Sequence, residues 1–583
     1  MTEWAIDGTT GYDFLNDVGG VFVDTASARR MRAIHGRVSG QNDRLTDVVY
    51  RSKLAIMDSS LSSELNVLAD ALDRLSESDR HSRDFTLNSL RSLLAETIAC
   101  FPTYRTYITE RGASDSDRQA IDRALVEAQA RNPTMEASSF EFLRGVLLPA
   151  SLPDPRRLAV TMKLQQLTAP VQAKGLEDTA FYRHNVLVSL NEVGGDPARF
   201  GRTVAEFHSE NSVRATQWPL GMLATSTHDT KLGEDARMRV HALAELPVEW
   251  GEAVTRWQRL TASARRRLPN GWAPDGSDVY RFYQTLVACW PPDALGLEAA
   301  PDGLVERMQQ YAVKATREAK LHTSWVTENH EYESAVGHFI ARVLSGPPAA
   351  RFLRAFDPMA RKAMGLGAIY SLAQLALKLA SPGVPDFYQG SEFWTLTLVD
   401  PDNRRPIDFD ARIAALDALE PLLDGLDSTD PIPPRPDVAA AAAALAETWT
   451  DGRVKLYVTA AGLRLRRAHP DLFLAGEYVP LEADVPAPAG VVAFARRRGR
   501  RTAVVVVPRL IAGIADPVAG PAKPAAWGDA RLWLPADLAV AEFVDVFTGV
   551  RHAPTREPDG RSSLPLGALL GPFPVALAVG LRV

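Results

Sequence analysis

The sequence predicts an α/β protein with long helical segments, a few buried strands and an antiparallel β domain at its C-terminal end. Apolar residues recur at spacings of three and four through residues 25–150 and 236–345, which is the period of an amphipathic helix. Two short apolar runs, 219–225 and 382–388, end in polar residues and are typical of buried strands. After residue 454, short β-branched segments are separated by Gly and Pro turns, a pattern that predicts antiparallel strands.

The helical segments extend over about residues 25–170 and 236–345. Residues 1–24 before them, which include the glycine-rich segment 8–14, are expected to be a loop. Residues 426–440 are rich in Asp and Pro and then in Ala, and indicate a domain boundary. We therefore expect two domains, one over residues 1–425 and a β domain over residues 445–583.

Polar residues follow the two buried strands where chemistry is expected. The first strand ends in Ser226-Thr227-His228-Asp229, and in parallel α/β folds the active site lies at the carboxyl ends of the strands. A third strand, over residues 101–108, is predicted more weakly. In the β domain the predicted strands are residues 454–458, 491–496, 502–507 and 531–534.

The composition argues against several classes of function. The net charge is -6 and the Lys and Arg residues are spread along the chain, whereas a nucleic-acid groove needs a clustered basic face. No uninterrupted apolar stretch reaches the roughly 18 residues of a membrane span. The two cysteines, Cys100 and Cys289, lie in different segments, and no Cys/His cluster has metal-ligand spacing. These features favour a protein of the reducing cytoplasm that binds neither nucleic acid nor membrane.

The pair His228-Asp229 is the sharpest candidate for catalysis. Glycoside cleavage passes through an oxocarbenium-like state, which needs a carboxylate near the anomeric carbon and hydrogen bonds to the sugar hydroxyls. The alternative is a loop cap, in which the Asp229 carboxylate bonds backbone amides and His228 is merely nearby. On the dipeptide alone, the loop cap is the better explanation.

Other segments have both a functional and a structural explanation. In 174–183, aromatic side chains could stack on sugar faces and charged ones could bind hydroxyls, or the segment could be an ordinary helix start. The segment 400–406 could bind substrate through its arginines or be a solvated charged turn. Trp218, Trp325 and Trp394 could be sugar platforms, although a tryptophan is more often a core residue.

Ten segments, taken together and in this order, resemble the maltooligosyltrehalose synthases of the α-amylase superfamily (glycoside hydrolase family 13). His228-Asp229 and the strand at 382–388 are shared across the superfamily, whereas 174–183 and 8–14 are specific to the synthases. The resemblance runs the length of the chain and favours the catalytic explanation of His228-Asp229. The ten segments are residues 8–14, 83–88, 100–107, 174–183, 190–197, 226–231, 322–325, 382–392, 400–406 and 451–457.

The resemblance implies a partial (β/α)8 barrel, made of the later strands, with large helical insertions and a C-terminal β-sandwich. It implies a (1→4)-α-D-glucan 1-α-D-glucosylmutase of trehalose biosynthesis, which converts the reducing-end α-1,4 bond of a maltooligosaccharide into an α,α-1,1 bond. The reaction is a retaining double displacement in which the released glucose turns over and attacks through its anomeric hydroxyl. No metal ion or other cofactor is implied.

By the same resemblance, Asp229 stabilises the transition state and His228 binds a neighbouring hydroxyl. The nucleophile aspartate and the acid/base glutamate of the family precede the segment that matches 8–14. Only seven residues precede Gly8, so we expect a chain that is truncated at its N-terminus and inactive alone. The residues expected to bind the substrate are Lys174, Glu177, Asp178, Phe181, Tyr182, Arg183, Lys231, Tyr388 and Arg404.

Three origins of a missing N-terminal part remain open: a misplaced gene start, a broken gene, or a separate N-terminal polypeptide. Two other functions also remain open. One is another hydrolase or transglycosylase of α-1,4 glucans, which would produce new reducing ends. The other is a non-catalytic glucan-binding subunit, which would bind maltooligosaccharide without converting it.

Overall fold

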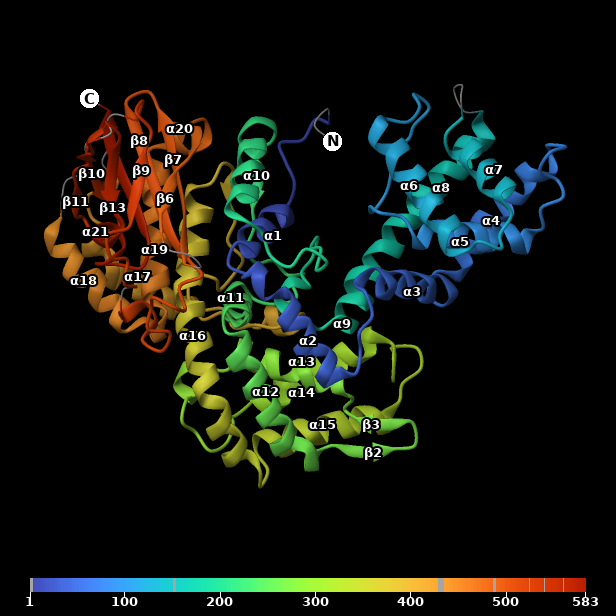
Figure 1. Cartoon of the computed structure of the whole chain (residues 1–583), viewed down its shortest axis with the longest axis horizontal. Helices are drawn as coiled ribbons and strands as arrows, with labels where there is room; N and C mark the ends of the chain where they lie inside the picture. The colour runs from blue at the N-terminus through green and yellow to red at the C-terminus, as the bar shows by residue number, and fades with distance from the viewer. Residues whose placement is uncertain are drawn as a thin grey trace. The chain divides into compact units, whose positions relative to one another are not determined.

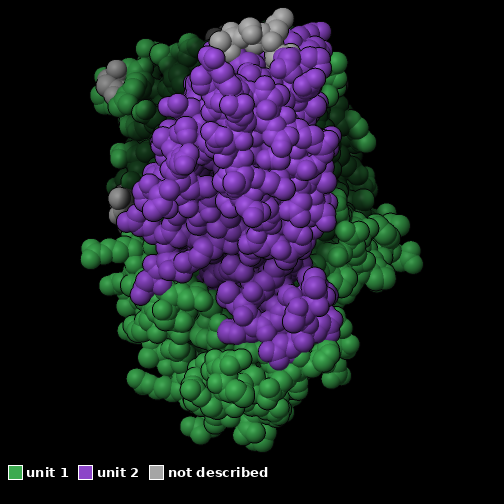
Figure 2. Space-filling model, turned by 90° about the vertical axis from the view of Figure 1, so that its right-hand side faces the viewer, with its two compact units in different colours: residues 1–41, 186–314, 330–583 green, residues 42–185, 315–329 purple. Residues whose placement is uncertain are grey.

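The computed structural model describes residues 4–149, 154–427, 435–485, 489–523, 525–538, 540–558 and 560–582. The chain forms two compact units, which Figure 2 distinguishes by colour. Unit 1 comprises residues 1–41, 186–314 and 330–583, and unit 2 comprises residues 42–185 and 315–329. Each unit has its own hydrophobic core.

Unit 2 is helical, as the apolar periodicity predicts. Its core is built from Leu, Ile, Val and Phe side chains that repeat every three or four residues, such as Leu65, Leu68 and Leu72 on one helix. Its elements are α3 (Leu45–Asp58), α4 (Ser62–Glu77), α5 (Leu87–Ala99), α6 (Asp115–Arg131), α7 (Ala137–Leu147), α8 (Pro155–Gln172), a π-helical stretch (Ala173–Ala180) and α9 (Phe181–Arg183).

The weak prediction of a strand over residues 101–108 is wrong. This segment is irregular in the structure and follows α5 directly. A side chain takes the place of a neighbouring strand: the Ile108 amide donates to Gln165 Oε1 at 2.6 Å, and Gln165 Nε2 donates to the Ile108 carbonyl at 3.1 Å. The backbone polar groups of Ile108 are therefore satisfied without a sheet.

Unit 1 joins a group of helices to the β region of the chain (Figure 1). The long helix α16 (Ala349–Ala380) runs through it and packs against helices as well as against strand β8. The other helices of unit 1 are α1 (Tyr12–Gly20), α2 (Ala28–Ser39), α10 (Val204–Gln217), α11 (Glu234–Ala242), α12 (Pro247–Thr261), α13 (Gly276–Cys289), α15 (His330–Leu344), α17 (Phe409–Leu423), α18 (Pro436–Glu447), α19 (Arg453–Ala468), α20 (Pro470–Leu474) and α21 (Leu566–Leu570), and α14 (Leu304–Ala319) begins there.

By length and composition, α16 is the one helix among the described residues that could cross a membrane, with a mean hydropathy of 1.3 over 18 residues. Every residue of that window is buried inside the structure. The apolar character of α16 is thus used in the core of unit 1.

The β region forms two antiparallel sheets, as predicted. The order of the larger sheet is β11-β10-β14-β8-β7-β5 and that of the smaller is β12-β13-β9-β6. The predicted strands 491–496, 502–507 and 531–534 lie within β7, β8 and β9. The bounds are β5 (Glu477–Pro480), β6 (Glu482–Asp484), β7 (Gly490–Arg498), β8 (Arg501–Arg509), β9 (Arg531–Leu534), β10 (Val540–Asp545), β11 (Arg551–His552), β12 (Thr555–Arg556), β13 (Ser562–Pro565) and β14 (Ala576–Arg582).

The predicted strand over residues 454–458 is wrong, because this segment begins the helix α19. The β-branched run is the first part of a longer apolar stripe at spacings of three, four and seven residues. The stripe packs α19 against α16. Its fully buried members are Val454, Tyr457, Val458, Ala461 and Leu465.

The expected loop over residues 1–24 is partly wrong, because residues 12–20 form the helix α1. Gly11, the residue before the helix, has a φ of 94°, a conformation that favours glycine. A Cβ atom at this position would lie 2.4 Å from the carbonyl oxygen of Met222. The glycine therefore permits a sharp turn directly against the first buried strand.

The carboxyl group of Glu245 joins the helices of unit 1 to the chain that follows β8. Glu245 accepts hydrogen bonds from the Tyr370 hydroxyl and, at 2.9 Å, from the Ala512 amide. Burial raises the pKa of Glu245 from 4.5 to about 7, although both hydrogen bonds act to lower it. Arg509 and Asp24 are the other charged groups that influence this carboxyl.

We expect this carboxyl to make unit 1 less stable at neutral pH than in mild acid. Its folded-state pKa is raised, so its contribution is complete below about pH 4.5 and is lost as the pH rises through about 7. The loss is on the order of 3 kcal/mol, at 1.36 kcal/mol per unit of pKa. Urea denaturation of the wild type and of Glu245→Gln across this range measures it. The difference between the two proteins should shift with pH, and a constant difference would contradict the assignment.

Candidate active site

The two predicted buried strands lie side by side as a parallel pair, β1 (Met222–Leu223) and β4 (Val384–Pro385). The register pairs Met222 with Val384, and the Asp386 amide donates to the Leu223 carbonyl at 3.2 Å. Because the strands are parallel, the loops that follow them leave the same edge. The predictions of both strands are confirmed, although each strand is shorter than its apolar run.

A lysine ties the ends of the two strands together. Lys378, near the end of α16, donates to the Thr225 hydroxyl at 2.8 Å after β1 and to the Asp386 carbonyl at 3.0 Å after β4. Its ammonium group also lies 3.9 Å from the centre of the Phe387 ring. Lys378 thus fixes the loop after β1 relative to the loop after β4.

Behind the strand ends, four charged side chains form a buried network. Lys455 of α19 lies 2.7 Å from both the Glu234 and the Asp235 carboxylates at the start of α11, and Lys378 lies 3.8 Å from Glu234. Burial alone would raise the pKa of Glu234, but Lys455 and Lys378 outweigh it and lower that pKa to about 2. Burial raises the pKa of Asp235, which Lys455 only partly offsets. The network joins α11, α16 and α19, and Lys378 connects it to the loop that follows β1.

The segment 8–14 lies along β1 and reaches the loop that follows it. The Met222 amide donates to the Thr9 carbonyl at 3.3 Å. The hydroxyl groups of Tyr12 and Thr227 lie 3.2 Å apart, within hydrogen-bonding distance. The glycine-rich segment 8–14 is therefore part of the support of the candidate site.

His228 and Asp229 lie in this loop with exposed side chains and a fixed backbone. The Asp229 amide donates to Thr227 Oγ1 at 3.1 Å, and the Thr230 hydroxyl donates back to the Thr227 carbonyl at 2.9 Å. Within the described parts of the chain, the Asp229 carboxylate has no hydrogen bond to a backbone amide, which the loop-cap explanation requires. The turn instead presents an imidazole and a carboxylate at the edge where β1 and β4 end.

Glu192 anchors the chain directly after Asp229, a role that the sequence did not indicate. Its carboxylate is buried and accepts from the amides of Lys231 at 2.7 Å and Leu232 at 3.2 Å. It also accepts from its neighbour Val193 at 3.0 Å and pairs with Arg237 at 3.2 Å. The segment 190–197 has the sequence of a turn, and through Glu192 it fixes the backbone that follows His228 and Asp229.

The charged segment 400–406 lies beside the same loop. Asn403 is buried, and its side-chain amide donates to the His228 carbonyl at 2.9 Å. Asp402 forms a two-pronged pair with Arg307 at 2.7 and 2.8 Å, which fixes the segment. Arg404 is exposed and pairs with Asp400 within its own turn. Asp402 and Asn403 position the turn next to His228, and Arg404 lies on its exposed side.

Of the remaining predicted binding residues, Lys231 and Tyr388 also lie in unit 1. Lys231 follows Asp229 by two residues and is half-buried. Tyr388 is half-buried in the loop after β4, where its carbonyl accepts from the Ser391 hydroxyl at 2.6 Å. The structure therefore brings His228, Asp229, Lys231 and Tyr388 to loops at one strand edge.

The segment 174–183 lies in unit 2, where it continues α8 as the π-helical stretch and α9. It is not a helix start, because the chain is already helical before it. Neither Phe181 nor Tyr182 offers an open ring face, because both are buried. Glu177 is buried too and accepts from the Tyr104 hydroxyl. π-Helical stretches are frequent at functional sites, so the wide helix itself is a feature of interest.

The charged residues of this segment are held by local contacts. Lys174 pairs with Asp178 at 2.7 Å on the surface of unit 2. Arg183 donates to the Ala319 carbonyl at 2.6 Å and to the Ser52 hydroxyl at 3.2 Å. Burial lowers the pKa of Arg183. Lys174 is the exposed member of this segment, and Leu176, Asp178 and Arg183 are half-buried.

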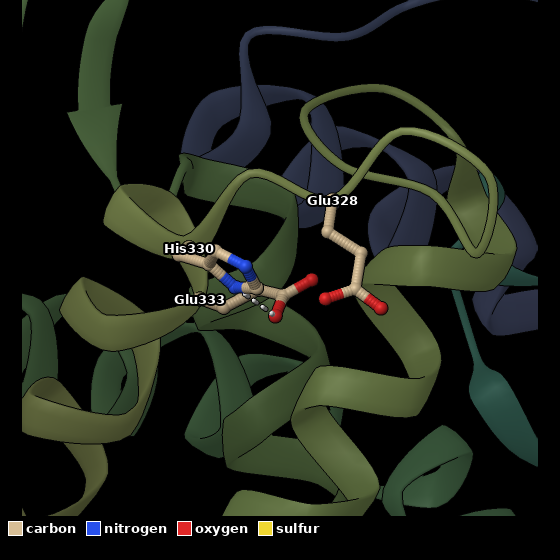
Figure 3. Close-up of side chains that lie close together, drawn as sticks. All are labelled: Glu328, His330 and Glu333. Carbon is tan, nitrogen blue, oxygen red and sulfur yellow. Dashed lines mark ion pairs between the residues drawn. The ribbon is translucent and has the colours of Figure 1, made fainter.

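A histidine and a carboxylate also lie together at the start of α15, where His330 Nδ1 is 4.0 Å from Glu333 Oε2 (Figure 3). His330 is largely exposed, and an i,i+3 pair of this kind is ordinary on a helix surface. We assign no metal ion to it.

The comparison with protein-family models finds no match. Two curated sequences of Mycobacterium tuberculosis, from strains CDC 1551 and H37Rv, are named "Putative maltooligosyl trehalose synthase". Each is 34% identical to this chain over 501 residues, which is 86% of this chain and 56% of the relative. The chain is thus similar over most of its length to proteins named as maltooligosyltrehalose synthases. It spans about half the length of the curated relatives it matches.

Solved maltooligosyltrehalose synthases have the same fold over this chain. The structure from Arthrobacter ramosus matches with a TM-score of 0.76 and 30% identity, covering 100% of this chain and 64% of that one. A hypothetical maltooligosyl trehalose synthase of Sulfolobus tokodaii matches with a TM-score of 0.69 and 28% identity, covering 100% of this chain and 63% of that one. The expected resemblance to this family is confirmed, as is the α/β fold class.

Proposed function

We propose that this chain carries part of the active site of a (1→4)-α-D-glucan 1-α-D-glucosylmutase. The enzyme converts the reducing-end α-1,4 bond of maltooligosaccharides into an α,α-1,1 bond. The observation that carries the proposal is the fixed turn at the common edge of β1 and β4, from which the imidazole of His228 and the carboxylate of Asp229 project. Homology to the synthases gives the substrate class.

In this proposal β1 and β4 are the later strands of a partial (β/α)8 barrel with large helical insertions. Asp229 stabilises the positive charge that develops at the anomeric carbon, because an exposed carboxylate on a rigid turn needs little reorganisation as that charge appears. His228 binds an adjacent sugar hydroxyl. Lys231, Tyr388 and Arg404, from the neighbouring loops, bind the same substrate.

The nucleophile aspartate and the acid/base glutamate of the reaction are proposed to lie outside these 583 residues. This accords with the part of the relatives that the chain does not match. A separate N-terminal polypeptide is one source of these two groups. We further propose that the enzyme works in the reducing cytoplasm, where Cys100 and Cys289 stay as free thiols.

The proposal is tested by titrating the purified chain with maltopentaose in a calorimeter and following the products by NMR. The chain alone should bind maltopentaose without converting it. When the part of the Arthrobacter relative that this chain does not match is added as a separate polypeptide, products without a reducing end should appear. Conversion by the chain alone would overturn the need for a second polypeptide. New reducing ends would identify a hydrolase or transglycosylase, and binding without conversion in the mixture would identify a glucan-binding subunit.

The residue assignment predicts that His228→Ala binds maltopentaose about tenfold more weakly, because one or two hydrogen bonds to sugar hydroxyls are lost. His330→Ala is the matched control, since His330 is an exposed histidine of the same unit on α15 (Figure 3). Its affinity should equal that of the wild type. Equal affinities of all three proteins would remove His228 from the site.

A further inference from the structure

Three large apolar side chains are exposed on one short loop of unit 2. They are Leu321 at 48%, Trp325 at 50% and Val326 at 87% exposure. Trp325 and Val326 occupy the tip of a turn that is closed by hydrogen bonds from the Ser324 amide to the Thr327 carbonyl at 3.0 Å and from the Thr327 amide to Ser324 Oγ at 2.9 Å. Exposed apolar side chains grouped in this way are typical of a binding surface.

Contacts on both sides hold this turn in place. The guanidinium of Arg317, in the last turn of α14, lies 5.0 Å from the centre of the Trp325 ring. Arg317 also pairs with Glu328 at 2.9 Å, on the other side of the turn. The Asn329 amide donates to the Thr323 hydroxyl at 2.9 Å and closes the base of the loop. The indole is therefore held in one orientation before any ligand arrives, which reduces the entropy cost of binding.

The loop is anchored on the segment 174–183. The Lys320 ammonium group donates to the Thr179 hydroxyl at 3.0 Å, and Arg183 donates to the carbonyl of Ala319. That segment presents Lys174, whose side chain is 60% exposed, on the surface of the same unit. An aromatic surface and a hydrogen-bonding cation are thus both available on unit 2.

We propose that Trp325 is a stacking platform for a glucose ring of the maltooligosaccharide. The proposal rests on the substrate class given under the proposed function. A pyranose ring has an apolar C–H face that packs on an indole, while its hydroxyls remain free for polar partners. Arg317 supports the indole by a cation–π contact and fixes its plane.

The other two candidate platforms are less suited to this role. The indole N–H of Trp394 donates to the Trp449 carbonyl at 2.6 Å, and its ring packs edge-on against Trp449. Trp218 is half-buried at the end of α10. Trp272 lies on β3 (Gly271–Ala273) in unit 1 and is 46% exposed, similar to Trp325. The guanidinium groups of Arg265 and Arg267 lie 5.4 and 5.5 Å from the centre of its ring. Trp272 serves as the matched control.

The experiment is a calorimetric titration of the whole chain with maltopentaose, for the wild type, Trp325→Ala, Trp325→Phe and Trp272→Ala. Trp325→Ala should weaken binding about tenfold, and Trp325→Phe should weaken it less, because a ring remains. Trp272→Ala should bind as the wild type does. Thermal unfolding should be unchanged in Trp325→Ala, since the side chain is exposed.

Intrinsic fluorescence gives a second measurement. Trp325 is the single tryptophan of the 11 in the sequence that belongs to unit 2. A fluorescence change on adding maltopentaose should be reduced in Trp325→Phe and retained in Trp272→Phe. Wild-type binding with unchanged affinity of Trp325→Ala would overturn this inference alone. Absence of binding by the wild type would overturn the proposed function and this inference together.

Discussion

Replacing Lys455 with methionine is expected to lower the free energy of unfolding of unit 1 by about 3–5 kcal/mol, because it leaves buried carboxylates without their counter-ion. Lys455 lies 2.7 Å from Glu234 and from Asp235, and all three side chains are almost completely buried. Lys378 remains beside Glu234 at 3.8 Å, so Asp235 is the group left without an ion pair. Methionine keeps the length and apolar stem of the lysine, so the loss measures the charge.

Urea denaturation followed by tryptophan fluorescence measures this effect, because every tryptophan except Trp325 lies in unit 1. Lys362→Met is the matched control. Lys362 pairs with Glu249 at 2.5 Å, but both side chains are partly exposed, and such surface pairs contribute about 1 kcal/mol or less. A similar small loss for Lys455→Met would mean that the buried network does not stabilise unit 1.

The pH dependence of Lys455→Met gives an independent check. Burial already raises the pKa of Asp235, and without Lys455 that pKa should rise further. A raised folded-state pKa adds stability at low pH that is lost as the pH rises. The deficit of the variant should therefore shrink as the pH falls from about 8 to about 5. Adding Asp235→Asn should restore part of the stability, since an amide oxygen can still accept from the Thr395 amide.

The sequence predicts the helices within residues 25–170 and 236–345 and the strands β1, β4, β7, β8 and β9, because their apolar patterns are long or cleanly bounded. The failures arise where a short pattern is ambiguous. Residues 454–458 have β-branched side chains, and only the continuation of the stripe to Leu465 identifies a helix. Residues 101–108 satisfy their backbone through the side chain of Gln165, which is 57 residues away from Ile108 in the chain. Local propensity contains no information on such a contact.

The candidate site was predictable in one respect and hidden in another. His228 and Asp229 follow directly from an apolar run, so their position at a strand end could be deduced. Their support comes from residues far apart in sequence, such as Glu192 and Asn403, which are polar residues in apparent turns. Lys378 did leave a signal, because a lysine within the apolar run at the end of α16 needs a buried partner.

Replacing Glu192 with glutamine is expected to loosen the loop that carries His228 and Asp229. The carboxylate accepts from four N–H groups, of Val193, Lys231, Leu232 and Arg237. Glutamine has nearly the same shape, but its NH2 group would face donors where an oxygen now accepts. We expect the free energy of unfolding of unit 1 to fall by about 2–4 kcal/mol, because buried donors, one of them charged, lose their acceptor.

Hydrogen–deuterium exchange of peptides covering residues 225–235 measures the loosening directly, and the Lys231 and Leu232 amides should exchange faster in Glu192→Gln. Glu206→Gln is the matched control, because Glu206 also accepts from a backbone amide, that of Thr203 at 2.8 Å, and pairs with Arg199, yet it is exposed. Glu206→Gln should lower the free energy of unfolding by about 1 kcal/mol. Faster exchange should be confined to the start of α10. If exchange near Asp229 stays at the wild-type rate in Glu192→Gln, the loop is held by its own turn and by Asn403, and Glu192 contributes only to stability. If exchange rises and maltopentaose affinity falls together, the rigidity of the turn is itself a requirement for binding the sugar.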